Sequence, residues 1–400
     1  MKTKNLINNT GFESTAIKDS GLGSTAHLPP IFATSTFVYE SPEEIMKVFK
    51  NEKEAYIYTR WDNPTVNFVE EKIAALATLN SDIKGKTLLF ASGMAAISSL
   101  IDTVVHPGDT VLAQSNIYGG SVELFDLLMK EKGVKVEYLD MHDLETLENR
   151  TQTASLIYIE SPSNPTINAY DIQQICSIAH QSNCKVAIDN TLSTPYLQRP
   201  LQLGVDFELH STTKYLNGHG TALGGAMVTT DNNFYEKCWN YRKLHGGVCS
   251  PFDAWLLNNG LKTLAIRMEK HCDNSELIVE FLNKRKEVTQ VNYLSLKDKK
   301  DHKIAEKQMY RYGGVLSFEL KGGIRAGIDL MKNIRFCTLT STLGTPDTLI
   351  NHPASMTHVK VNEEQKLRFG ITDGLIRMSV GLEDVNDIIA DLGQALDSIS

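Results

Sequence analysis

Short apolar runs alternate with helical stretches along the middle of this 400-residue chain. The runs predict seven strands, at Lys86–Ala91, Thr110–Gln114, Val134–Leu139, Ser155–Glu160, Lys185–Asp189, Val205–Ser211 and Ala226–Thr229. Strands that are separated by helices usually form a parallel sheet covered on both faces. We therefore predict a mainly parallel seven-stranded α/β domain, whose ligands gather at the carboxyl ends of the strands.

The flanking regions have other patterns. Residues 1 to about 60 lack sustained periodicity and contain Pro29-Pro30, which predicts an extended arm with a short helix near Pro42 to Asn51. Further helices are predicted at Thr65–Leu79 and from Pro251 to about Lys286, and further strands at Gly314–Leu320 and Ile376–Val380. Strands set among helices after the main sheet indicate a smaller C-terminal α+β domain.

Composition narrows the class of protein. The formal net charge is -8, and the Lys-rich run Lys297–Lys303 contains Asp298 and Asp301, so we expect no nucleic-acid partner. Residues 1–9 are polar without an apolar signal core, and no run approaches the ~20 apolar residues that span a membrane. We expect a cytoplasmic protein with no membrane partner.

Cysteines and histidines do not indicate a metal site. The six cysteines occur singly, at Cys176, Cys184, Cys238, Cys249, Cys272 and Cys337. Without a C-x-x-C pair, neither a disulfide scaffold nor a zinc ribbon is indicated. His352 and His358 lack the i, i+4 spacing of a helical metal pair, so we predict structural roles for them and no metal.

Two strand ends suggest a specific chemistry. Asp189 closes one apolar strand, and Lys214 follows another with Ser211 and Thr213 beside it. A desolvated lysine can act as a nucleophilic amine, and a carboxylate can keep a pyridine nitrogen protonated. The pair therefore predicts pyridoxal 5'-phosphate (PLP) bound as a Schiff base with Lys214, although a lysine near a strand end is more often simply solvated.

Other strand ends carry groups that suit the same cofactor. Ser92-Gly93-Met94 joins a strand to a helix, so its backbone N–H groups can bind phosphate. Tyr118 could stack on an aromatic ring, Asn164 offers a side-chain donor, and Ser211 and Thr213 offer hydroxyls. Each has an ordinary structural explanation when taken alone, whereas their occurrence in one sheet favours a shared site.

Nucleotide motifs give no competing prediction. Gly21-Leu-Gly23-Ser-Thr-Ala26 matches G-x-G-x-x-A, but it follows polar residues and runs into Pro29-Pro30, so it lacks the strand and helix that a dinucleotide site needs. The chain contains neither G-x-x-x-x-G-K-[ST] nor G-x-S-x-G, so nucleotide hydrolysis and α/β-hydrolase chemistry have no motif support.

From about Pro29 onward the chain resembles the Cys/Met-metabolism family of PLP enzymes, which includes cystathionine γ-synthase, cystathionine γ-lyase, methionine γ-lyase and O-acetylhomoserine sulfhydrylase. The matching segments are Tyr56–Thr65, Ser92-Gly-Met, Tyr118-Gly-Gly, Glu160-Ser-Pro-Ser-Asn-Pro, Asp189-Asn-Thr191, His210–His219, His352–His358 and Ile376–Asp384. Their joint occurrence is highly specific.

The resemblance implies PLP fold type I, as in aspartate aminotransferase, and a homotetramer built as a dimer of dimers. It implies an arm over residues 1–62 that reaches a neighbouring subunit, a PLP-binding domain over 63–255 and a C-terminal domain over 256–400. Tyr58 and Arg60 would then contact the cofactor phosphate of that neighbour. The resemblance also extends the cofactor-binding set to Thr191.

Roles in catalysis follow from the same resemblance. Lys214 would hold the cofactor and then move protons as a general base, Asp189 would keep the ring nitrogen protonated, and Tyr118 would protonate the leaving group. Arg377 would bind the substrate α-carboxylate through paired hydrogen bonds. The expected substrate is a small amino acid.

Substrate selection rests on departures from the family pattern. Gly120 stands where methionine γ-lyases usually have Cys. Cystathionine enzymes usually have Glu immediately before Ser-Leu-Gly, whereas the run here is Thr340-Ser341-Thr342-Leu343-Gly344 and contains no acid. Arg242 and Lys243 would make the substrate entrance more basic. We expect γ-elimination from a sulfur-containing or homoserine-derived amino acid, with homocysteine or acylated homoserine used at least as well as methionine. The alternatives are γ-replacement with a thiol and a non-catalytic PLP-binding protein.

Overall fold

A computed structural model of the chain describes residues 11–19, 26–356, 359, 366 and 369–399. The larger of its two sheets contains β1 (Lys86–Phe90), β2 (Thr110–Gln114), β3 (Lys135–Leu139), β4 (Leu156–Glu160), β5 (Lys185–Asp189), β6 (Phe207–Ser211) and β7 (Gly225–Thr229). The strand order is β1-β7-β6-β5-β4-β2-β3, in which only β7 runs antiparallel to its neighbours. All seven predicted strands are confirmed, and none of their ends moves by more than two residues.

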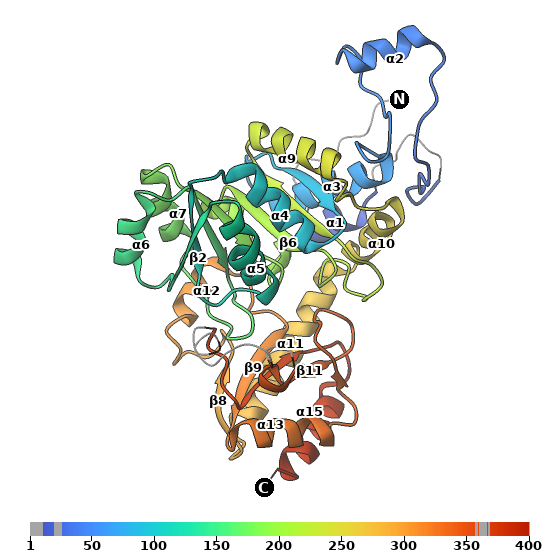
Figure 1. Cartoon of the computed structure of the whole chain (residues 1–400). Helices are drawn as coiled ribbons and strands as arrows, with labels where there is room; N and C mark the ends of the chain where they lie inside the picture. The colour runs from blue at the N-terminus through green and yellow to red at the C-terminus, as the bar shows by residue number, and fades with distance from the viewer. Residues whose placement is uncertain (1–10, 20–25, 357–358, 360–365, 367–368, 400) are drawn as a thin grey trace.

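Helices cover both faces of this sheet (Figure 1). The chain up to the end of the sheet contains α1 (Phe12–Ile17), α2 (Pro42–Phe49), α3 (Pro64–Ala77), α4 (Gly93–Val104), α5 (Gly119–Glu123), η1 (Leu124–Met129), α6 (Leu144–Thr151), α7 (Ile172–Gln181), α8 (Thr194–Leu197) and η2 (Pro200–Leu203). Two further helices, α9 (Asn232–His245) and α10 (Pro251–Leu261), follow β7. Side chains of α1, α3, α7 and α10 pack on one face, and those of α4, α9 and η1 pack on the other. Burial on both faces explains why the strands are apolar throughout.

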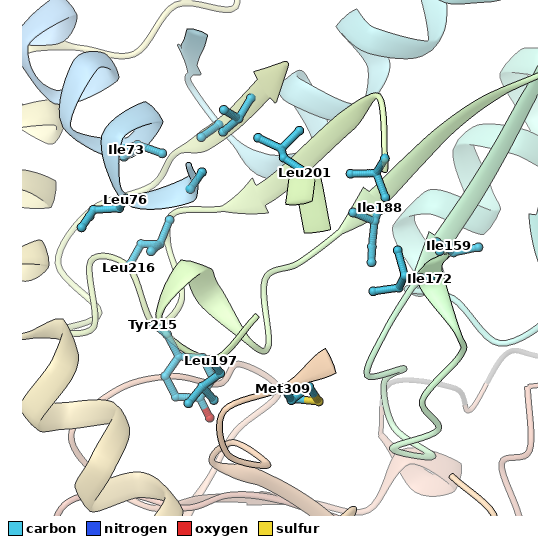
Figure 2. Packing of buried hydrophobic residues seen from close by; sticks show 14 of the residues in the cluster. Ile73, Leu76, Ile159, Ile172, Ile188, Leu197, Leu201, Tyr215, Leu216 and Met309 are labelled. Atoms are coloured by element: carbon cyan, nitrogen blue, oxygen red, sulfur yellow. The ribbon is translucent and has the colours of Figure 1, made fainter. Parts of the chain in front are cut away.

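Figure 2 shows how one of these two cores is built. Ile159 of β4 and Ile188 of β5 lie near Ile172 of α7, while Ile73 and Leu76 of α3 belong to the same buried cluster. Alternate residues of a strand point to opposite faces, so Tyr158, next to Ile159, belongs to the cluster on the other face. The two cores hold the strand ends in a fixed arrangement.

The second sheet lies in the C-terminal part of the chain. Its strands are β8 (Val288–Asn292), β9 (Val315–Leu320), β10 (Thr338–Leu339), β11 (Leu349–Asn351) and β12 (Leu375–Ser379), in the order β10-β11-β12-β9-β8. Helices α11 (Leu264–Leu282), α13 (Gly323–Asn333) and α15 (Val385–Asp397) supply apolar side chains to its core, and α12 (His302–Gln308) and η3 (Pro353–Ser355) complete this region. The sequence predicts only β9 and β12, because β8 is largely exposed and β10 and β11 are very short.

The helical segment predicted from Pro251 to about Lys286 is confirmed, as two helices. It is divided at Lys262 and Thr263 into α10 and α11. The carbonyl oxygen of Gly260 at the break accepts a hydrogen bond from Arg267 Nη2 at 2.8 Å, so a side chain replaces the helical donor. The boundary proposed after residue 255 falls inside α10, which packs on α3.

The N-terminal region has two different parts. Phe12 and Ala16 of α1 are buried in the first core, and the Lys72 ammonium of α3 donates to the carbonyl of Ala16 at 3.0 Å. Helix α2 instead projects away from both sheets (Figure 1). The described part of the arm that stands free is therefore shorter than residues 1–62.

The G-x-G-x-x-A match at Gly21–Ala26 lies outside the described residues, except for Ala26. His358, at the end of the His352–His358 segment, also lies outside them. Over the ranges that are described, no helix has the length and apolar character required to cross a membrane.

Candidate functional site

A pocket of about 340 Å³ opens at the carboxyl ends of β4, β5 and β6, beside the start of α4. The C-terminal region closes it with residues 341–343, which lie between β10 and β11, and with Arg377 of β12. The predicted residues that line it are Ser92, Gly93, Met94, Tyr118, Asn164, Asp189, Thr191, Ser211, Thr213, Lys214, Ser341, Thr342 and Arg377. Its remaining lining residues are Ile97, Glu160, Pro162, Leu192, Leu223 and Leu343. The tertiary fold thus brings together most of the positions that the sequence suggests.

Lys214 is held in the turn that follows β6. Its backbone N–H donates to the carbonyl of Ser211 at 3.2 Å, and its own carbonyl accepts from Gly218 at 2.7 Å. The Lys214 Nζ donates to Thr342 Oγ1 of the C-terminal region at 2.8 Å. The turn and this contact fix the amine at the pocket from two sides.

The surroundings of Lys214 favour its neutral amine. Burial is the main cause that lowers the pKa of Lys214, and the positive charge of Arg377 lowers it further, against the opposing effect of Asp189. A lysine becomes nucleophilic and basic only in its uncharged form. This environment therefore suits the chemistry predicted for the residue.

Asp189 is partly buried at the end of β5, next to Thr191. Its Oδ1 accepts the backbone N–H of Thr191 at 3.0 Å, and Thr191 Oγ1 in turn accepts the backbone N–H of Ser211 at 2.7 Å. Burial raises the pKa of Asp189, although the Thr191 hydrogen bonds and the charges of His210 and Lys214 oppose the rise. A cationic partner in the pocket would favour the carboxylate.

The turn Ser92-Gly93-Met94 begins α4 at the other side of the pocket. Ser92 Oγ caps the helix by accepting the backbone N–H of Ala95 at 3.1 Å. A Cβ at Gly93 would lie 3.0 Å from Ser211 Cβ, so glycine allows the helix start to approach the end of β6. This start, with Ser211 and Thr213 beside it, offers backbone and hydroxyl donors for an anion.

Arg377 of β12 is buried, and its guanidinium is held at the pocket by backbone oxygens. Nη2 donates to the carbonyls of Ser341 at 3.1 Å and Thr342 at 2.8 Å, and Nη1 donates to Asn164 Oδ1 at 3.4 Å. Burial lowers the pKa of Arg377 to about 10, and Nε has no hydrogen-bond partner among the described residues. An unpaired buried donor in a pocket suits a carboxylate ligand.

Tyr118 lies at the start of α5 and is half exposed at the pocket. Gly120 does not line the pocket, but a Cβ there would lie 2.6 Å from Tyr118 Cε1 and 3.2 Å from Met94 Sδ. The absence of a side chain at Gly120 therefore leaves room for the Tyr118 ring.

The prediction that Arg242 contacts the substrate is wrong. Its side chain is 2% exposed and donates through Nη1 to Glu70 Oε1 at 2.6 Å and to the Leu89 carbonyl at 2.8 Å. Burial acts to lower the pKa of Arg242, but Glu70 and then Asp62 raise it overall. Arg242 lies on the side of α9 that faces the protein interior. The sequence reading had placed it at the substrate entrance.

Tyr58 and Arg60 do not line this pocket. The Arg60 guanidinium lies 5.5 Å from the centre of the Tyr58 ring, and Nη1 donates to the Lys243 carbonyl. The two residues thus lie together where the arm meets α9.

Within the described ranges, no cluster of three or more His, Cys, Asp or Glu side chains could hold a metal ion.

Residues 14–397 match the family model of the Cys/Met metabolism PLP-dependent enzymes. The chain belongs to this family. It is 43% identical to an L-methionine gamma-lyase of Fusobacterium nucleatum subsp. nucleatum, over 96% of this chain and 100% of the relative. It is 36% identical to an O-succinylhomoserine sulfhydrylase of Pseudomonas aeruginosa, over 92% of this chain and 91% of the relative.

Solved structures agree with this membership of the Cys/Met metabolism family. A cystathionine gamma-lyase from Lactobacillus plantarum, complexed with L-serine, superposes with a TM-score of 0.90 at 35% identity, covering 98% of this chain and 99% of that chain. The protein is therefore a PLP-dependent enzyme with fold type I, as the sequence predicts.

The pocket residues fit the cofactor of the Cys/Met metabolism family. A partly buried lysine amine, a partly buried carboxylate and a helix start with free backbone donors line one cavity. They match the aldehyde, ring nitrogen and phosphate of PLP in chemical type.

Sequence reasoning missed Glu160 as a pocket residue, although it closes β4 as Asp189 closes β5. The two are paired in the sheet register. A polar residue at the end of an apolar strand is the signal that could have identified it. The apolar lining residues carry no such signal, because packing explains them equally well.

Proposed function

We propose that this enzyme eliminates the γ-substituent of a sulfur-containing or homoserine-derived L-amino acid. The products are an α-keto acid, ammonia and a thiol or other leaving group. The observation that carries the proposal is that one pocket is lined by four groups. These are the Lys214 amine with its lowered pKa, the partly buried Asp189 carboxyl, the Tyr118 phenol and the Arg377 guanidinium, whose Nε has no partner among the described residues.

When bound, PLP supplies an electron sink that stabilises the negative charge left at Cα after proton loss. In this proposal the residues at the phosphate are Ser92, Gly93, Met94, Ser211 and Thr213, with donors from the start of α4. Asp189 would pair with the ring nitrogen, while Thr191 holds the Asp189 carboxyl, and Asn164 would supply a side-chain donor to the cofactor.

The protein groups then divide the remaining work. Arg377 binds the α-carboxylate with its free donor and holds Cα near Lys214. The Lys214 amine removes the Cα proton, passes it to the bound cofactor and so becomes neutral again, and then removes one Cβ proton. Its lowered pKa suits both transfers. Tyr118 donates its phenolic proton to the departing γ-group, and the half-exposed ring leaves space for that group to depart.

The lining favours an apolar substituent on the leaving atom. Ile97, Leu192, Leu223 and Leu343 line the pocket, whereas Arg242 does not reach it. Arg242 therefore gives no support to the basic entrance, which the sequence reading combined with Gly120 and Ser341 to predict a broader preference. We propose methionine and related thioethers as preferred substrates, with support from the lyase named in the Fusobacterium relative.

Gamma-replacement with a thiol is the second candidate. It is favoured by the 36% identity to the sulfhydrylase of Pseudomonas aeruginosa. Both reactions need the same proton transfers, so the pocket groups described above serve either one. A non-catalytic PLP-binding role gives no reason for a basic amine and a free carboxylate-binding donor in one pocket.

Assembly and location are part of the proposal. We propose a cytoplasmic homotetramer in which Tyr58 and Arg60 of one subunit contact the cofactor phosphate of its neighbour. Support comes from their position on the arm, close to each other and outside the lining of their own chain's pocket. The six buried cysteines form no disulfide, as expected in a reducing compartment.

Product analysis tests the proposed reaction. Methionine, homocysteine, cystathionine and O-acylhomoserines are each supplied with and without an added thiol, and α-keto acid, ammonia and thioether products are measured. We expect keto acid and ammonia from methionine without added thiol. Replacement product alone would establish the second candidate.

Lys214→Ala provides the residue-level test. It should retain cofactor but lose about 10³-fold or more in kcat, because it removes the proposed base. The exposed lysine variant Lys321→Ala is the matched control and should keep full activity. Normal turnover by Lys214→Ala would exclude the proposed mechanism.

A further inference from the structure

The Glu160 carboxyl is a pocket group to which the proposed reaction gives no task. Glu160 ends β4, is 5% exposed and lines the pocket. Its backbone pairs with that of Asp189 in the sheet register, so a buried and a partly buried acidic residue occupy neighbouring strand ends. A buried carboxyl has a high desolvation cost unless it makes strong hydrogen bonds.

The hydrogen bonds of Glu160 join two separate loops. Its Oε1 accepts the backbone N–H of Tyr118 at 2.6 Å, and the carboxyl also accepts the backbone N–H of Asn164. Tyr118 follows β2, and Asn164 follows β4. One side chain thus holds the main chain at two of the pocket residues that the sequence singled out.

A second set of contacts braces Glu160 itself. Its backbone N–H donates to Gln114 Oε1 at 3.0 Å, and Gln114 Nε2 donates to Asn116 Oδ1 at 3.0 Å. Gln114 is the last residue of β2, and Asn116 lies two residues before Tyr118. The start of the Tyr118 loop is therefore attached to the end of β4 at two points.

Burial and then the neighbouring Asp189 raise the pKa of Glu160 well above its ordinary range, and the two amide hydrogen bonds only partly oppose this. An acceptor oxygen is available whether the carboxyl is ionised or neutral. The contacts to Tyr118 and Asn164 therefore do not require a negative charge.

We propose that Glu160 is a positioning residue, whose carboxyl oxygens hold the Tyr118 and Asn164 amides and thereby orient the Tyr118 ring and the Asn164 side chain at the pocket. The inference rests on the proposed function only for the consequence in catalysis, since the clamp itself belongs to the fold. Glu160 transfers no proton in this scheme. Its hydrogen-bonding reach, and not its charge, is the property that matters.

Three variants separate reach from charge. Glu160→Gln keeps an acceptor oxygen at the same distance, Glu160→Asp keeps the charge with a shorter reach, and Glu160→Ala removes the acceptor. Misplacement of a reacting group by about 1 Å can cost about 100-fold in rate. We expect kcat to fall about 10-fold to 100-fold in the Ala and Asp variants, with Gln restoring it to within about 3-fold of the original enzyme.

Amide hydrogen exchange provides a readout that does not depend on activity. In the full-length protein, Glu160→Ala and Glu160→Asp should exchange faster at residues 115–124 and 161–168, and Glu160→Gln should not. Glu319→Ala is the matched control, since Glu319 is a partly buried acid of β9 that accepts from Thr372 in the second sheet. It should leave exchange in both loops unchanged.

A double-mutant cycle with Tyr118→Phe tests whether Glu160 acts through that ring. The loss of kcat caused by Glu160→Ala should be smaller in the Tyr118→Phe background, because the positioned phenol is already absent.

Unchanged amide exchange in Glu160→Ala overturns the proposal that Glu160 holds the two loops. Equal loss of kcat in Glu160→Gln and Glu160→Ala overturns the positioning role in favour of proton transfer. If Glu160→Ala does not fold, the Gln and Asp variants still decide the question. Absence of lyase activity in the original enzyme refutes only the proposed function, since the exchange result stands apart from it.

Discussion

Replacement of Arg242 by methionine should weaken the fold without altering substrate choice. Arg242 is 2% exposed, and its partner Glu70 is 5% exposed, so their 2.6 Å contact is a buried ion pair. Removal of one partner leaves a buried carboxylate without its cation, which typically costs about 3–5 kcal/mol. The Leu89 carbonyl also loses a donor. The variant should therefore unfold more easily.

The size of the effect can be stated as a melting temperature. With roughly 2.1 cal/mol/K of unfolding entropy per residue over 400 residues, the loss lowers Tm by about 4–6 °C. Differential scanning calorimetry of the cofactor-bound protein measures this shift. The exposed variant Arg325→Met is a matched control and should shift Tm by less than about 1 °C.

Two further results bear on the same prediction. The double variant Glu70→Leu with Arg242→Met should recover part of the lost stability, because an apolar pair of similar volume avoids the unpaired charge. The ratio of kcat/KM for O-acylhomoserine to that for methionine should stay as in the original enzyme. An unchanged Tm together with a selective loss on acylated substrates would refute the argument and restore Arg242 to the substrate site.

Three other predictions concern the pocket and the arm. Arg60→Ala should raise the Kd of PLP about 10-fold or more, since a charged hydrogen bond is worth roughly 1.5–3 kcal/mol. Mixing Arg60→Ala subunits with Lys214→Ala subunits should restore some activity. Verified mixed oligomers without activity would contradict the shared site. Gly120→Cys should lower kcat and shift the cofactor absorbance, because the new Cβ would lie 2.6 Å from Tyr118 Cε1 and displace the ring. A crystal structure of the variant with the Tyr118 ring unmoved would disprove this displacement. In the cofactor-free protein, Lys214 has a lowered pKa, so the unfolded state binds more protons than the folded state between the folded pKa and 10.5. Lys214 therefore makes the free energy of unfolding rise with pH in that window, and denaturant titrations of Lys214→Met should lack this rise. Identical pH dependence in both proteins would count against a partly buried amine.

The sequence alone predicts the strands and the chemistry at their ends. The seven strands of the larger sheet are apolar because helices cover both faces, so each run appears in the sequence without knowledge of its neighbours. Lys214 and Asp189 interrupt this pattern with polar groups at strand ends, where a parallel sheet places its ligands. The family, the fold and most pocket residues follow from these local signals.

Only the tertiary structure decided which side chains face the pocket. Arg242 and Lys243 are adjacent on α9, and helical geometry turns neighbouring residues about 100° apart, so the sequence could not tell that Arg242 points inward to Glu70. Glu160 is a pocket residue that the sequence did not reveal. Its carboxyl contacts Tyr118, which follows β2, and Asn164, which lies beyond the end of β4. Such contacts depend on packing between distant segments, whereas periodicity records only whether a position is buried.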